Sequence, residues 1–184
     1  PGAATSHSIY QTTTGSNPLI IQGIQGGGSL TFAVTYNSIT VDLLLESEVG
    51  GAEMSVFGLV APASGANTVA VTWGGSSQTV RTFAASYTGV QQSGLADATL
   101  VSRETTGATT WTGTITTVAN PTWSAFFIGT LGGGGTLVAS TNVTDRSNQS
   151  FLMWGDGDSG DAGTFAQTAT WTTSDNDHRI LQVE

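Results

Sequence analysis

The sequence predicts an all-β protein: an antiparallel β-sandwich, jelly-roll-like, with no significant helix. Thr, a residue that favours strands, is the most frequent type, and the chain has 31 Thr, 19 Ser and 25 Gly. Apolar residues alternate with polar ones along much of the chain, as in strands buried on one face. Clusters of Gly, Pro, Ser and Asn separate these segments at the spacing typical of sandwiches.

Alternation locates the individual strands. In Ile39–Glu46 and Asn67–Trp73, apolar residues recur at every second position, which places their side chains on one face of the strand. Trp123–Leu131 is apolar on both faces, which predicts a central strand buried on both sides. The predicted strands, in chain order, are Ser8–Thr13, Leu19–Gln25, Leu30–Tyr36, Ile39–Glu46, Glu53–Val60, Asn67–Trp73, Val80–Tyr87, Thr99–Arg103, Thr109–Val118, Trp123–Leu131, Gly135–Ser140, Phe151–Trp154, Thr164–Trp171 and Ile180–Val183.

No linker or charged run divides the chain, so the sequence predicts one sandwich domain over residues 1–184. The uncharged, hydroxyl-rich start Pro1–Thr14 is predicted to be an extended arm that pairs onto a neighbour. The similar segments AVTW, TTWTG and ATWTT are attributed to strand composition rather than to duplication. An initial Pro is typical after removal of an initiator Met, so we expect an intact chain made in a cytoplasm.

Composition excludes several classes of function. The chain has a net charge of −9, no Lys and only four Arg, which argues against nucleic-acid partners and anionic membrane surfaces. It has no Cys, which excludes disulfides, thiolate metal sites and cysteine nucleophiles. No apolar run approaches the roughly 20 residues of a membrane-spanning helix. The remaining classes are structural, adhesive and hydrolytic proteins.

Four segments in order resemble a sandwich module of bacteriophage structural proteins and secreted bacterial multi-domain proteins. They are NPLIIQGIQ with VTYNSITVDLLLES, MSVFGLVAPASGANTVAVTW, FAASYTGVQQ and TATWTTSDNDHRILQVE. The chain departs from such modules after Val90, where Gln91 and Gln92 precede Ser93 and Gly94 rather than a Gln-Thr-x-Pro turn. It also departs at the loop GDGDSGDAG, which in such modules consists of Gly and Ser.

The resemblance implies a structural or adhesive role and brings no catalytic residues. We therefore expect a non-enzymatic virion protein, a capsid decoration (cement) protein or an exposed tail or fibre module of a phage. Its expected partners are other virion proteins and copies of itself, and its expected location is the virion surface. The alternative is a carbohydrate-binding or adhesion module of a tail fibre or secreted protein.

The cluster Asp156, Asp158 and Asp161 is the sharpest local motif. Closely spaced carboxylates on a Gly-rich loop are ligands suited to Ca²⁺. An EF-hand loop would have Glu where this chain has Gln167, and no flanking helices are predicted. Asp175 and Asp177 add ligands if the fold brings the two loops together. The alternative is a solvated hairpin loop, and no other cofactor is expected.

Trp154 adjoins this loop and is the candidate glycan contact, exposed at the tip of the sandwich; the alternative is simple packing. The other four Trp residues follow strand patterns and are predicted to lie in the core. Glu46, Glu48 and Glu53 are predicted to be solvated edge carboxylates rather than a glycosidase pair. His7 and His178 are too few and too isolated for a zinc site, and no Gly-x-Ser-x-Gly nucleophile elbow occurs that would support a Ser-His-Asp triad.

Overall fold

The computed structural model confirms an all-β fold made of antiparallel strands. It describes residues 5–28, 30–49, 52–74, 79–93, 98–104, 107–118, 122–130, 137–138, 143–149, 152–172 and 178–184. These residues contain sixteen strands, β1 to β16, and no helix. Consequently, no helix long and apolar enough to cross a membrane is found in this part of the chain.

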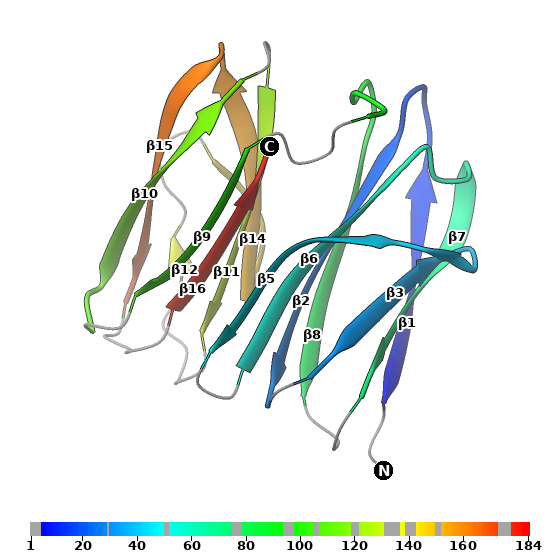
Figure 1. Cartoon of the computed structure of the whole chain (residues 1–184), viewed down its shortest axis with the longest axis horizontal. Coiled ribbons are helices and arrows are strands. Elements are labelled where there is room, and N and C mark those ends of the chain that lie inside the picture. Colours follow the sequence, from blue (N-terminus) through cyan, green and yellow to red (C-terminus); the bar gives the residue numbers. More distant parts are fainter. Residues whose placement is uncertain are drawn as a thin grey trace. The chain divides into compact units, whose positions relative to one another are not determined.

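The contacts of the chain gather in two compact units, Pro1–Leu95 and Ala96–Glu184. The sequence predicts a single sandwich domain over residues 1–184, and the structure has two compact units in this range. Figure 1 shows both units as layered sheets.

The first unit contains two antiparallel sheets. Its strands are β1 (Ser6–Thr13), β2 (Leu19–Gly27), β3 (Phe32–Tyr36), β4 (Ile39–Thr40), β5 (Asp42–Val49), β6 (Ala52–Val60), β7 (Gly65–Trp73) and β8 (Val80–Tyr87). One sheet has the order β1-β7-β3-β4 and the other has the order β5-β6-β2-β8. Most connections cross from one sheet to the other, which is why neighbours in a sheet are distant in sequence.

The second unit is also a pair of antiparallel sheets. Its strands are β9 (Thr99–Glu104), β10 (Thr110–Thr117), β11 (Thr122–Thr130), β12 (Leu137–Val138), β13 (Thr144–Gln149), β14 (Leu152–Gly160), β15 (Gly163–Trp171) and β16 (His178–Val183). The sheet orders are β10-β15-β12 and β13-β14-β11-β16-β9.

The two units share one strand order. The series β1-β7-β3 corresponds to β10-β15-β12, and β5-β6-β2-β8 corresponds to β13-β14-β11-β16, while β9 and β4 have no counterpart. Individual positions also match. β7 and β15 each have nine residues, begin at a Gly with positive φ and end at a buried Trp, Trp73 or Trp171. The backbone N–H of Trp73 donates to the Thr5 carbonyl and that of Trp171 to the Thr109 carbonyl, each at 3.0 Å.

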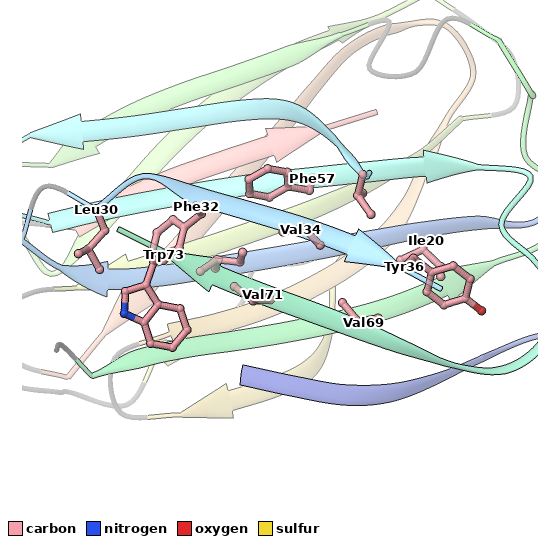
Figure 2. Packing of buried hydrophobic residues seen from close by; sticks show 11 residues of the cluster. Ile20, Leu30, Phe32, Val34, Tyr36, Phe57, Val69, Val71 and Trp73 are labelled. Atoms are coloured by element: carbon pink, nitrogen blue, oxygen red, sulfur yellow. The ribbon is translucent and has the colours of Figure 1, made fainter. Parts of the chain in front are cut away.

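Each unit has its own hydrophobic core between its two sheets. In the first, Phe32 and Trp73 from one sheet pack with Phe57 and Ile24 from the other. Figure 2 shows this cluster, with Trp73 near Leu30 at one end and the Tyr36 ring at the other. In the second unit, Trp111 stacks on Phe126 with ring centroids 5.9 Å apart, so one sheet again packs on the other.

The predicted strands agree with the observed ones at most positions, with four main differences. One is that β14 continues to Gly160, where the sequence predicts an end at Trp154. Ile39–Glu46 is divided at Val41, and β5 carries a bulge between Leu43 and Leu45 that shifts its alternation. β13 was not predicted, because its polar sequence TDRSNQ has no alternation. Residues 6–13 of the predicted arm form β1, an edge strand paired with β7, and residues 1–4 lie outside the described part.

Candidate functional site

The predicted Asp loop is largely a strand. Asp156 and Asp158 belong to β14, and Asp161 follows in the short turn before β15. Alternation along β14 places Asp156 and Asp158 on one face. β14 continues through this Gly-rich segment because both its neighbours, β11 and β13, supply ladder partners: Asp156 lies opposite Ala125 and Thr144.

Two of the three carboxylates already have partners within the fold. Asp156 is buried and accepts a hydrogen bond from Arg146 Nε at 2.7 Å, which makes an ion pair across β13 and β14. Asp158 Oδ1 accepts the backbone N–H of Gly160 at 2.7 Å, a contact that shapes the turn. Asp161 is exposed. In the ranges that can be described, no group of three or more His, Cys, Asp or Glu side chains is arranged to hold a metal ion. Asp175 and Asp177 lie outside those ranges.

Trp154 is the third residue of β14 and has a paired strand on each side, so it does not lie at the tip of the sandwich. It is half-buried and stands opposite Phe127 of β11 and Ser147 of β13. Trp123 is the exposed one, with 47% of its surface accessible. It lies opposite the exposed Asp158, next to a bulge between Thr122 and Trp123. The extra residue at this bulge lies on β14, between Asp158 and Gly160, so β11 keeps its alternation and Trp123 stays on the same face as Phe127. Phe127 is buried and Trp123 is exposed, so the prediction of a core position is wrong for Trp123.

Three other Trp residues are buried, as predicted from their strand patterns: Trp73, Trp111 and Trp171. The indole N–H of Trp171 donates to the Ala108 carbonyl at 2.7 Å. His178 is buried and stacks on Trp171, with centroids 3.7 Å apart and planes at 15°. His7 is exposed on β1. His178 is thus part of the packing of the second unit.

A carboxylate cluster lies on the hairpin of β5 and β6. Glu48 faces Glu53 directly across the two strands, and Glu46 faces Ser55 one step further. Glu46 and Glu48 are exposed, as the sequence predicts, but Glu53 is only 1% exposed, so the prediction of a solvated carboxylate is wrong there. Sequence alternation alone would have placed Glu53 on the same face as Phe57, which is part of the core.

Burial raises the pKa of Glu53 to about 8, helped by a hydrogen bond with the Glu46 carboxyl and by the negative charges of Glu46 and Glu48. The Ser55 hydroxyl donates to Glu53 Oε1 at 2.9 Å and acts in the opposite direction. A carboxyl group that keeps its proton at neutral pH is a feature of general acids. However, a side chain 1% exposed offers no surface to a substrate. We therefore interpret the hairpin of β5 and β6 as a structural element.

Comparison with protein-family models, curated proteins and solved structures gives no match.

Proposed function

We propose that this chain is a non-enzymatic structural protein of a virus particle, either a capsid decoration (cement) protein or an exposed tail or fibre module of a phage. It acts by protein–protein contacts at the particle surface after synthesis in the host cytoplasm. The partners are other virion proteins and copies of the chain. Resemblance of the four segments to phage modules supports the proposal, as does the repeated sandwich.

The observation that carries the proposal is the Thr-rich face of β10 and β15. Thr110, Thr112, Thr114 and Thr116 have exposed side chains along β10. Across the strands, Thr112 Oγ1 lies 3.1 Å from Thr168 Oγ1, a cross-strand hydrogen bond that orders the face. Such a face can be covered by a partner without burying a charge, and depletion of charge is typical of the centre of an interface.

The proposal is tested by adding the full chain to phage particles produced without it. We expect co-sedimentation with the particles at a fixed ratio, and the double substitution Thr112→Glu with Thr168→Glu should weaken it by more than tenfold. Ile39→Glu with Thr40→Glu, which adds the same two charges at exposed positions of the short strand β4, is the matched control and should bind normally. A chain that neither sediments with particles nor occurs in purified virions would refute the proposal.

A specific observation favours carbohydrate binding as the second candidate function. An exposed aromatic ring can stack on a sugar, and an exposed carboxylate beside it can accept hydrogen bonds from the sugar hydroxyls. Trp123 opposite Asp158 is such a pair. It replaces Trp154 as the candidate contact. A glycan array should then show binding that Trp123→Ala abolishes and that chelation of divalent ions does not change. Loss of binding on chelation would instead indicate a metal-dependent site.

A further inference from the structure

Most sheet edges in this protein carry features that discourage pairing with another strand. Natural proteins protect edges by short strands, bulges, charges and Pro. Three kinds of protection occur here. The edge strands β4 and β12 have two residues each. β5 and β13 are bulged and carry charged residues. β8 and β9 contain charged residues, Arg81 in the first and Arg103 with Glu104 in the second.

The edge strands β1 and β10 have none of these features. Each has eight residues, a regular register with one neighbour and no Lys, Arg, Asp, Glu or Pro. Within the ranges that the structure covers, β1 pairs only with β7, and β10 pairs only with β15. The two strands occupy the same place in the shared strand order, so the unprotected edge is repeated once in each unit. Figure 1 shows both at the margin of their sheets.

The register shows which backbone groups point away from each sheet. Thr5 accepts the Trp73 N–H and Thr109 accepts the Trp171 N–H, so alternate residues from Thr5 and Thr109 onward are bonded to the neighbouring strand. The residues between them direct their N–H and C=O outward. These outward residues are Ser6, Ser8, Tyr10 and Thr12 in β1 and Thr110, Thr112, Thr114 and Thr116 in β10.

One outward group is already satisfied. The Thr12 carbonyl accepts the Ser86 hydroxyl at 3.1 Å, and Gln11 Nε2 donates to Ser86 Oγ at 3.2 Å. This contact closes one end of the β1 edge and leaves Ser6, Ser8 and Tyr10 for an added strand. Tyr10 is 82% exposed, so its ring is free to cover a partner strand.

We propose that each of the two edges, β1 and β10, pairs with the same edge of a second copy of this chain. The sheets then extend from one molecule into the next. Each edge is complementary to itself, because antiparallel pairing about a two-fold axis joins the outward N–H and C=O groups of one copy to those of the other. The charge distribution determines where two copies can meet. Copies that each carry a net charge of −9 repel one another, most strongly where carboxylates gather, as on β5. The neutral edges are where two copies approach at the lowest electrostatic cost. With one such edge in each unit, a chain has two attachment points and can form assemblies larger than a dimer.

The inference deepens the proposed structural function by naming a surface and a partner. It is tested on the full chain by sedimentation velocity over a range of concentrations, with one Lys placed on each edge. We expect wild type to form dimers and larger species. Ser8→Lys or Thr114→Lys alone should limit association to dimers, and the double variant should remain monomeric, with dissociation constants raised at least tenfold.

Controls separate the edge from the face of the sheet. Ala166 lies directly opposite Thr114 and is exposed, and Thr72 lies opposite Ser6 and is exposed. Thr72→Lys and Ala166→Lys therefore add the same charge to the same sheets on inner strands, and both should associate like wild type. Circular dichroism and thermal melting check that every variant is folded. Hydrogen exchange supplies an independent readout: the N–H groups of Ser8 and Thr114 should become protected on association.

The outcomes distinguish this inference from the proposed function. A wild-type chain that stays monomeric at the highest concentration, or a double edge variant that associates like wild type, refutes edge pairing. Binding to phage particles by such a monomer would leave the proposed function intact. Edge-dependent association without any binding to particles would support the inference and contradict the virion role.

Discussion

Glu48 lies directly opposite Glu53 on the hairpin of β5 and β6, so two carboxyl groups share one face of a sheet. Like charges in this position destabilise a sheet if both are ionised. The fold avoids this by burying Glu53, because burial raises the pKa of its carboxyl group to about 8 and the group keeps its proton at neutral pH. The hairpin therefore depends on a proton that a free carboxyl group would have lost.

We expect the stability of the chain to fall as the pH rises from about 4.5 to about 8. Glu53 has a pKa near 4.5 when exposed and about 8 when folded, so in this window only the folded chain holds the proton. The stabilisation is complete below the lower value and is lost as the pH passes the upper one. The slope is at most about 1.4 kcal/mol per pH unit. Urea unfolding at a series of pH values measures it.

Glu53→Gln keeps the shape of the side chain and removes its proton equilibrium. The variant should show a flatter pH profile than wild type and greater stability at pH 8. Asp42→Asn, an exposed substitution on β5, the partner strand of β6 in the same hairpin, is the matched control and should leave the slope unchanged. Parallel profiles for Glu53→Gln and wild type would show that Glu53 does not carry the effect.

Much of the fold could be predicted from local pattern. Val69, Val71 and Trp73 point into the core as their alternation predicts, and β11 is buried on both faces over most of its length. Turn clusters such as APASG mark the ends of strands correctly. These features depend on neighbours in sequence, which a single chain displays directly.

Local sequence pattern did not predict the division into two units or the contacts of the candidate site residues. The units share strand order but few side chains besides those at the ends of β7 and β15: the position of Val69 in β7 is that of Gln167 in β15. Asp156 has strand partners and Arg146 as its ion partner, and none of these contacts is local in sequence. Similarly, Trp123 and Phe127 share one face of β11, yet only Phe127 is buried, a difference that alternation along the strand does not predict.

Gln182→Leu should stabilise the protein. Both amide atoms of Gln182, like those of Gln167, are buried with no hydrogen-bond partner among the described residues. Burying an unsatisfied amide costs about 1–3 kcal/mol, which an apolar side chain avoids, so we expect a gain of about 1 kcal/mol in urea unfolding. Gln22→Leu should gain less, because Gln22 Nε2 donates to the Gly23 carbonyl at 3.0 Å. Destabilisation by Gln182→Leu would indicate that a buried water satisfies the amide.

Tyr36→Phe should destabilise the first unit by about 1 kcal/mol. The buried Tyr36 hydroxyl donates to the Ala63 carbonyl at 2.9 Å and accepts from Asn67 Nδ2 at 3.0 Å. Thr13 Oγ1 donates to the same carbonyl at 2.6 Å, so the hydroxyl joins three strands and the turn after β6. Thermal melting measures the loss. Tyr10→Phe removes a hydroxyl from a ring that is 82% exposed, and an equal loss there would contradict the explanation.

Addition of Ca²⁺ should leave the melting temperature of the chain unchanged. Asp156 is engaged by Arg146 and Asp158 by the Gly160 N–H, so ion binding would have to break both contacts. A ligand that binds only the folded state raises the melting temperature, and the absence of a shift reports the absence of binding. A rise abolished by Asp158→Asn would instead establish the calcium site that the sequence motif predicts.

Gly113→Ala should destabilise the second unit, because β10 needs a residue without a side chain at this place. A Cβ on Gly113 would overlap the ring of Trp111 and come within 2.9 Å of Leu100 Cδ2. The ring cannot move aside easily, since it stacks on Phe126 and its indole N–H donates to Ser102 Oγ at 3.0 Å. Overpacking of this kind costs about 1–3 kcal/mol, measurable by urea unfolding. Gly74→Ala is the matched control, because a Cβ there meets no atom within 4 Å. A similar loss in both variants would show that the glycines matter through backbone entropy and not through the space beside Trp111.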